Sequence, residues 1–259
     1  MKSFQKLVLL IHHAKLDNCP NSIYLTAEEK STSKSKPKLW DIFKTKKVLG
    51  LDVSENILAI HAILGCDTTS RIHNIGKGDS LKKFIANEEF RYHLSKFGNL
   101  NATQNEIADS AQKLISILYG ERNEVKLGNI RYRMFCKKVA SSKTVVLPEH
   151  LPPTSDAAKF HSFRVFHQVQ VWKGNDSLSA EHWGWVIKGN FMLPKLMEQP
   201  PAPADLLKLI KCNCMTDCAS TRCSCKKHGL NCTAICGVCK GVSCLNCQDV
   251  DLSEDTQEK

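Results

Sequence analysis

The sequence KCNCMTDCASTRCSCKKHGLNCTAICGVCKGVSCLNC, residues 211–247, decides how the C-terminal part of this chain folds. It holds ten of the thirteen cysteines and almost no large apolar side chains. A segment with so few apolar groups cannot offset the entropy cost of its own ordering by burying a core. Disulfide bonds or bound metal ions must therefore hold it together.

The spacing of these thiols favours bound metal over disulfide bonds. Two Cys-x-Cys pairs, at 212–214 and 223–225, and two Cys-x2-Cys pairs, at 236–239 and 244–247, each place two thiols where one tetrahedral ion can bind both. The thirteen cysteines are an odd number, and no convincing secretory signal accompanies them, which makes an oxidised framework the poorer fit. The sequence therefore predicts thiolate-bound zinc.

The number of cysteines suggests how many ions they bind. Nine thiolates can supply the twelve bonds of three tetrahedral zinc ions if three thiolates each bridge two ions. The residues from Lys211 to Asn246 resemble the tesmin-type CXC domain, with Cys-Asn-Cys at 212–214 and Arg-Cys-Ser-Cys at 222–225; Cys247 lies outside the family pattern. Members of that family bind three zinc ions through nine cysteines and contact DNA. The resemblance implies these zinc ligands: Cys212, Cys214, Cys218, Cys223, Cys225, Cys232, Cys236, Cys239 and Cys244.

Basic residues lie among the cysteines. Three zinc ions with nine thiolates carry a net charge of about −3, which repels a phosphate backbone unless basic side chains reverse the local field. The resemblance to CXC domains implies that Arg222, Lys226 and Lys227 meet DNA phosphates or a groove. The alternative is that these residues only neutralise the cluster and keep it soluble.

Composition supports an anionic partner and a folded chain. The 259 residues carry a formal charge of +10 with a pI of about 9.0, which suits nucleic acid without identifying it. The hydrophobic fraction of 42% is that of a folded protein. No apolar run approaches the roughly 20 residues that a membrane span needs. We expect no membrane association and a reducing, nuclear location.

Two predictions concern the N-terminal part. The short apolar run Leu7–Ile11 predicts a buried parallel strand. Residues 28–47 carry seven lysines among serines and threonines, and predict a solvated loop ending near Leu39 and Trp40. A lysine-rich surface is one interpretation of this loop, and contact with a DNA backbone is the other.

Residues 48–86 predict a helix, a glycine-rich turn and a second helix. Ser54 is the expected N-cap of a helix that is buried around most of its girth. Turns follow at 65–70 and 74–78, and Asp79 is the expected cap of the next helix. Free amides at such a turn can bind a phosphate group.

This order resembles the helix–two-turn–helix region of the flap-endonuclease, PIN-like superfamily. The matching segments are Leu-Gly-Cys-Asp at 64–67 and Ile-Gly-Lys-Gly at 75–78. The resemblance implies that Asp67 binds magnesium. It also implies that a phosphate is held by Gly76, Lys77 and Gly78. The alternative is that Asp67 only caps a turn.

The resemblance does not extend to a complete catalytic site. Two-metal phosphodiester chemistry needs several converging carboxylates. Where the family has Asp-x-Asp, this chain has Ser-Phe-Gln at 3–5. We therefore expect no catalytic residue, a truncated and inactive nuclease-like portion with Asp67 as a vestige, and a role for magnesium only if nuclease activity survives.

Further helices are expected downstream. A capping box formed by Thr103 and Glu106 begins a helix that ends at Gly120. A second helix covers 127–139, and a long one runs from Thr154 or Ser155 to Trp172. The aromatic segments 183–185 and 191–194 are expected to form core or cover more readily than a base-stacking platform. Cys66 and Cys136 are expected to be buried.

The predicted fold is mixed α/β and mostly helical, with a partial PIN-like nuclease-type domain followed by a small irregular zinc-cluster module. The predicted divisions are a PIN-like region at 1–100, a helical region at 101–198, a proline-rich linker with a short helix at 199–210, a CXC module at 211–247 and a disordered acidic tail at 248–259.

The arrangement as a whole resembles a group of animal proteins that look derived from mobile elements. The shared segments are residues 65–70, 151–154, 183–185, 200–203 and 212–244. Our leading hypothesis is a zinc-dependent DNA-binding protein with an inactive nuclease-like portion. The alternatives are a nuclease whose missing acids come from a longer native chain or from a partner, and a protein-interaction scaffold stapled by zinc.

Overall fold

The computed structural model describes residues 2–15, 22–26, 38–121, 126–141, 146–199, 210–233, 236–242 and 244–247. The chain divides into two compact units. The first comprises Met1–Tyr132 and Glu149–Glu198, and the second comprises Arg133–Pro148 and Gln199–Lys259. The predicted short helix at 205–210 and the acidic tail lie almost entirely outside the described residues.

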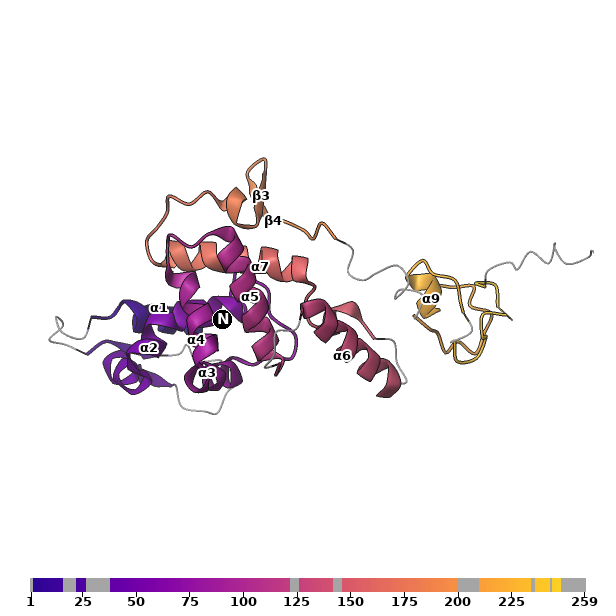
Figure 1. Cartoon of the computed structure of the whole chain (residues 1–259), viewed down its shortest axis with the longest axis horizontal. Helices are drawn as coiled ribbons and strands as arrows, with labels where there is room; N and C mark the ends of the chain where they lie inside the picture. Colours follow the sequence, from indigo (N-terminus) through magenta and orange to yellow (C-terminus); the bar gives the residue numbers. More distant parts are fainter. Residues whose placement is uncertain are drawn as a thin grey trace, which may run out of the picture. The chain divides into compact units, whose positions relative to one another are not determined.

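The described chain is mostly helical, as predicted (Figure 1). Its elements are α1 (Lys2–His13), β1 (Tyr24–Thr26), β2 (Leu39–Asp41), α2 (Ile42–Ile63), α3 (Lys77–Ala86), α4 (Glu88–Ser95), η1 (Lys96–Gly98), α5 (Gln104–Leu118), α6 (Leu127–Ser141), η2 (Pro148–His150), α7 (Ser155–Trp172), η3 (Ala180–Trp183), β3 (Trp185–Lys188), β4 (Phe191–Pro194) and α9 (Ser224–Lys227). The strands form two antiparallel pairs, β1 with β2 and β3 with β4. Among the described helices, none combines the length and the apolar character that a membrane span requires.

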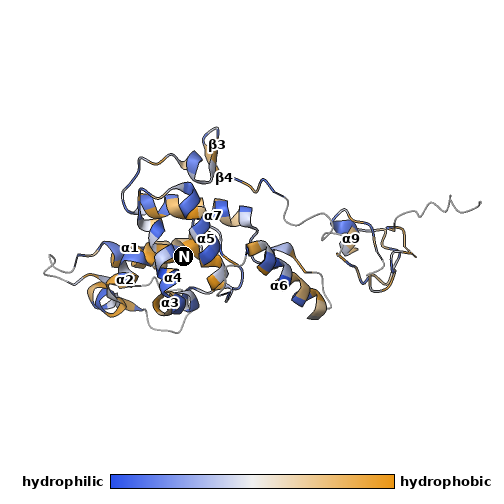
Figure 2. Cartoon of the chain, viewed as in Figure 1, coloured by the Kyte–Doolittle hydropathy of each residue, from blue (hydrophilic) through white to orange (hydrophobic). Residues whose placement is uncertain are grey.

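The N-terminal segment is a helix, so the prediction of a buried parallel strand at Leu7–Ile11 is wrong. Leu7, Val8 and Ile11 are buried, and Leu7 and Ile11 form a cluster with Ile42 at the start of α2. With Phe4, these apolar positions recur at i, i+3, i+4 and i+7, which is the spacing of one helix face. In Figure 2 the helices of the first unit carry both hydrophobic and hydrophilic residues, as expected for helices with one buried side.

The course of α2 corrects one further prediction. Of the expected lysine-rich loop, residues 28–37 lie outside the described residues, and its predicted end near Leu39 and Trp40 agrees with β2 at Leu39–Asp41 and the start of α2 at Ile42. Asp41 caps this helix, because its side chain accepts a hydrogen bond of 3.0 Å from the Lys44 amide. Ser54 is not an N-cap: it is buried, and its hydroxyl donates to the Gly50 carbonyl at 2.7 Å. Gly50 itself departs from helical geometry at φ +78°, so α2 is kinked there.

The predicted helix, glycine-rich turn and second helix are confirmed. The second half of α2 is buried around most of its girth from Leu58 to Ile63, and Gly65 turns the chain away at φ +99°. The next helix, α3, begins at Lys77 with Gly76 as its N-cap, three residues before the predicted cap at Asp79.

Two long helices supply much of the first unit's core. The capping box of Thr103 and Glu106 is present at the start of α5, and Thr154 caps α7 by accepting from the Ala157 amide. The ring of Phe166 in α7 packs against Trp183, with centroids 4.1 Å apart. All three features agree with the sequence prediction.

Two predictions of burial are wrong. Trp183 and Trp185 cover the core as expected, but β4 is exposed along its whole length, with Phe191 72% exposed. A two-stranded hairpin buries at most one face of each strand, and no other described element covers β4. Cys136 on α6 is exposed and Cys66 is half-buried, where both are predicted to be buried.

Candidate metal centre

The core of the second unit consists of cysteine side chains. The buried members are Cys212, Cys218, Cys223, Cys225, Cys232, Cys236, Cys239 and Cys244. Cys214 and Cys247 are partly buried and pack against them. Several apolar residues of the same segment face solvent: Met215 is 87% exposed and Val242 83%. All nine predicted ligands thus lie in one cluster, while the few apolar side chains contribute little to it.

The sulfur atoms are spaced as the corners of metal-binding tetrahedra. The Sγ atom of Cys212 lies 3.7 Å from those of Cys218 and Cys232 and 3.8 Å from that of Cys239. Cys223 and Cys232 are 3.8 Å apart. A tetrahedron with zinc–sulfur bonds of about 2.3 Å has edges of about 3.8 Å, whereas a disulfide bond is about 2.05 Å long. The cluster could therefore hold a metal ion.

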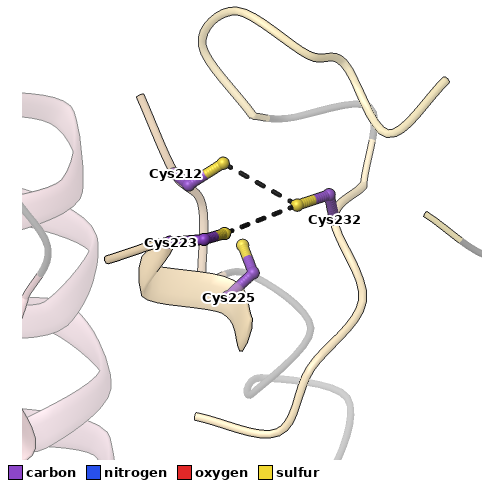
Figure 3. Close-up of side chains that lie close together, drawn as sticks. All are labelled: Cys212, Cys223, Cys225 and Cys232. Atoms are coloured by element: carbon purple, nitrogen blue, oxygen red, sulfur yellow. Dashed lines mark hydrogen bonds between the residues drawn. The ribbon is translucent and has the colours of Figure 1, made fainter. Parts of the chain in front are cut away.

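Groups of four thiols can be drawn within this cluster. In each of three groups the ligand atoms lie within 4.8 Å of one another. The groups are Cys212, Cys223, Cys225 and Cys232; Cys212, Cys214, Cys218 and Cys223; and Cys212, Cys218, Cys232 and Cys239. Figure 3 shows the side chains of the first group converging. Cys212 belongs to all three groups, and because the groups overlap they do not fix the number of ions.

Tight turns bring these cysteines together. Cys218 and Lys240 have φ of +61° and +52°, a conformation that most residues avoid. Gly241 has φ of +70°, and a Cβ atom there would lie 2.7 Å from the backbone of Thr233 and 2.8 Å from the Cys232 carbonyl oxygen. Glycine is therefore required at 241 for two backbone segments of the cluster to approach each other.

Hydrogen bonds from N–H groups reach several of the sulfur atoms. The amides of Cys212 and Thr233 both donate to Cys236 Sγ at 3.5 Å, and the Asn246 side chain donates to Cys232 Sγ at 3.4 Å. Such donors orient metal-bound thiolates and stabilise their charge. Asn246 ends the stretch that resembles a CXC domain, but the sequence alone predicts no contact between its side chain and a sulfur atom.

The electrostatics of the cluster also suit a cation. Burial raises the pKa of the Cys212 thiol to about 12 and raises that of Cys232 as well. Burial opposes ionisation of Cys223 too, but the Lys226 amide and neighbouring thiols lower its pKa to about 7. So many thiols in one site cannot all ionise alone, and a divalent cation supplies the charge that lets them do so.

The predicted DNA-binding residues of this module are exposed. Arg222, Lys226 and Lys227 lie at or beside α9, although the Lys226 ammonium also donates to the Ala219 carbonyl at 2.6 Å. Asp217 is the only acidic residue between 210 and 247. The surface around α9 is therefore basic.

The other predicted site residues lie in the first unit. Asp67 is exposed, and none of the candidate metal-ligand groups found among the described residues includes it. Gly76 and Gly78 lie at the start of α3. The ammonium of Lys77 turns inward, where it donates to His61 Nδ1 at 2.7 Å and to the Gly65 carbonyl at 2.9 Å. Phosphate binding at this turn stays a prediction.

Comparisons of the chain with protein-family models, with curated proteins and with solved structures find no match. The residues themselves define a cysteine-rich protein whose second unit carries a cluster that could hold metal.

Proposed function

We propose that this chain is a zinc-dependent DNA-binding protein whose cysteine cluster is the structural centre of the binding module. The observation that carries the proposal is the set of sulfur–sulfur distances of 3.7 to 3.8 Å around Cys212. They fit the edges of a tetrahedral zinc–thiolate site. All-thiolate tetrahedral sites select zinc or iron–sulfur centres, and bridging thiolates, three zinc ions and nine ligands are the arrangement that the CXC resemblance implies.

Zinc would act by folding the module. The second unit buries sulfur where an ordinary domain buries hydrocarbon, so its order depends on metal–ligand bonds. No catalytic position is proposed for these ions, because thiolates fill the coordination sites in a structural centre.

DNA contact is supported by the distribution of charge. Five basic residues lie between 210 and 247 against one acidic residue. Arg222 and Lys227 are exposed and have no side-chain partner among the described residues, so their charges are available to phosphate groups. A nuclear location, expected from the composition and cysteine usage, and an inactive PIN-like region at residues 1–100, implied by the sequence resemblance, complete the proposal.

The test measures zinc and DNA binding on the full chain, purified under reducing conditions. Zinc per chain is determined by elemental analysis, and binding to a duplex is titrated at several salt concentrations. We expect about three zinc ions, and an affinity that falls steeply with salt because phosphate contacts release counterions. The double variant Arg222→Ala/Lys227→Ala should bind more weakly and with a salt slope smaller by about two.

The matched control is Lys126→Ala/Lys188→Ala, which removes the same charge from exposed positions of the first unit. It should leave DNA binding unchanged. Two zinc ions or fewer would overturn the nine-cysteine, three-ion cluster. A fully loaded chain that does not bind DNA would favour the interaction scaffold instead.

A further inference from the structure

The first unit contains a cavity of about 200 Å³ between α1, β2, α2 and α3. Some of the apolar residues that line it are buried: Leu7, Val8, Ile11 and Ile60. The other apolar residues of its wall are half-buried or exposed: Phe4, Trp40, Leu49, Ile57 and Leu81. The cavity therefore extends from the surface into the apolar interior, and a small molecule can enter it from solvent.

Three residues of the wall carry polar side chains: Thr45, His61 and Lys77. The hydroxyl of Thr45 donates to the Asp41 carbonyl at 2.6 Å, so its single proton is used. The Nδ1 atom of His61 accepts from the Lys77 ammonium at 2.7 Å. Its other ring nitrogen, Nε2, is buried with almost no accessible surface, so a molecule in the cavity cannot bond to it. Neither Thr45 nor His61 provides a donor for a ligand.

Lys77 is the one charged residue that lines the cavity. Two of its three N–H groups are used, because the ammonium donates to His61 and, at 2.9 Å, to the Gly65 carbonyl. The same ammonium lies 5.2 Å from the centroid of the Phe4 ring, whose face attracts its charge. A cationic ligand is repelled here. An anionic ligand loses its hydration in an apolar cavity whose wall has few donors to replace it.

The volume of the cavity sets the size of a ligand. An apolar cavity of about 150 Å³ accepts a benzene molecule and stays dry when it is empty. The cavity between α1 and α3 is slightly larger, so it accommodates a benzene ring with one short substituent. Burial of the ligand's apolar surface would drive binding, since the wall supplies no matching set of polar partners.

We propose that this cavity is a binding site for a small, uncharged, apolar molecule of the size of a benzene ring with one short substituent. The ligand packs against the apolar residues of α1 and α2 and needs no hydrogen bond to His61 or Lys77. This proposal concerns the first unit alone and does not rest on zinc or DNA binding by the second.

NMR spectroscopy of the full, zinc-loaded chain, labelled at the isoleucine δ1 methyl groups, tests the proposal, because Ile11, Ile57 and Ile60 line the cavity. Toluene, added to about 5 mM at pH 7, should shift these three methyl resonances through its ring current and give a Kd of about 1 mM or tighter. The methyl group of Ile107, which is buried in α5 and does not line the cavity, should not shift.

Two charged probes test the polarity of the site. Benzoate and benzylammonium carry the same ring with a negative and a positive charge, and are titrated to about 20 mM. Each should bind at least about tenfold more weakly than toluene, because each must lose its hydration. Benzylammonium also brings a second positive charge to Lys77.

The variant Leu81→Trp tests the location of the site. It places a larger side chain in the wall formed by α3, and should weaken toluene binding about tenfold or more. The matched control is Ile85→Trp on the same helix. Ile85 is 59% exposed and does not line the cavity, so this variant should bind toluene as the wild type does.

Three results would overturn the proposal: no toluene-induced shift of the three cavity methyl groups, a charged probe that binds as tightly as toluene, or an unchanged toluene affinity in Leu81→Trp. If the methyl spectrum shows that Leu81→Trp does not fold, Leu49→Trp takes its place, at a half-buried position of α2 that also lines the cavity. Its control is Leu51→Trp, at a position that is 69% exposed.

Discussion

The Sγ atoms of Cys212 and Cys239 lie 3.8 Å apart, although the two residues are 27 positions apart in the chain. Cys212 belongs to every candidate metal group, whereas Cys247 lies at the edge of the cluster and donates to the Cys244 carbonyl at 2.8 Å. The ten cysteines of residues 211–247 are therefore not equivalent, and replacing them one at a time should show which of them bind metal.

Replacing Cys212 with serine should remove about half or more of the bound zinc, because one thiolate serves several tetrahedral groups. Cys247→Ser should retain the wild-type zinc content, since a hydroxyl can still donate to the same carbonyl. Elemental analysis of the two purified variants makes the comparison. Equal zinc loss in both variants would show that Cys247 binds zinc as Cys212 does.

Gly65→Ala should destabilise the first unit by about 2 to 3 kcal/mol. Its φ of +99° disfavours any side chain, and the added Cβ would lie 2.7 Å from Arg71 Cγ and 2.9 Å from Arg71 Cα. Urea unfolding followed by tryptophan fluorescence measures the effect, because all four tryptophans belong to the first unit. The control is Gly78→Ala on α3, where no atom lies within 4 Å of the new Cβ. Helix propensity predicts that Gly78→Ala stabilises by up to about 1 kcal/mol.

The first unit should lose stability in mild acid through His161. This residue is buried in α7 and bonded to the Ile63 carbonyl at 3.0 Å, and burial lowers its pKa from 6.5 to about 4. Between these values the unfolded chain binds a proton that the folded chain does not, so stability is full above pH 6.5 and declines as the pH falls toward 4. The slope from this group is about 1.4 kcal/mol per pH unit.

His161→Gln retains an N–H donor but does not titrate, so its unfolding free energy should depend less on pH across this window than that of the wild type. Urea unfolding at a series of pH values, again by tryptophan fluorescence, provides the measurement. His182→Gln, at an exposed position on η3, should leave the wild-type slope in place. A His161→Gln slope identical to the wild type would exclude His161 as the source.

Magnesium-dependent cleavage of flap DNA is not expected. Asp67 is exposed, and none of the candidate metal-ligand groups among the described residues contains a carboxylate. Two-metal catalysis needs several carboxylates around ions about 4 Å apart. A gel assay with magnesium compares the wild type with Asp67→Ala. Cleavage by the wild type that disappears in this variant would restore the nuclease alternative.

The cysteine cluster could be predicted from the sequence because thiol spacing is itself a geometric constraint. Pairs such as 223–225 cannot place their sulfur atoms far apart, and the near absence of apolar residues leaves the thiols as the core. Which thiols approach across long loops, such as Cys212 and Cys239, depends on turns at Cys218 and Lys240 that the residue types do not indicate.

The first unit was predictable where local signals were strong. Gly65, Thr103 and Thr154 mark helix ends through their own backbone preferences or hydrogen bonds. The prediction at Leu7–Ile11 is wrong because a short apolar run fits a buried strand and a helix equally well. The helical spacing that includes Phe4 favours the helix.

Tertiary contacts account for what the sequence does not reveal. His61 and Lys77 are 16 residues apart, and no local pattern indicates that the turn after Gly65 carries Lys77 back against α2. Likewise, the apolar residues of β4 suggest burial, yet the hairpin leaves Phe191 in solvent.

A core built of sulfur alters how the second unit responds to temperature. Unfolding a hydrocarbon core exposes apolar surface to water and raises the heat capacity, which curves the stability of ordinary domains. The second unit hides little such surface, with Met215 and Val242 already in solvent. Its unfolding should show a small heat-capacity change, so its free energy of unfolding should depend almost linearly on temperature. Because metal binds the folded unit, mass action should make its melting temperature depend strongly on the concentration of free metal.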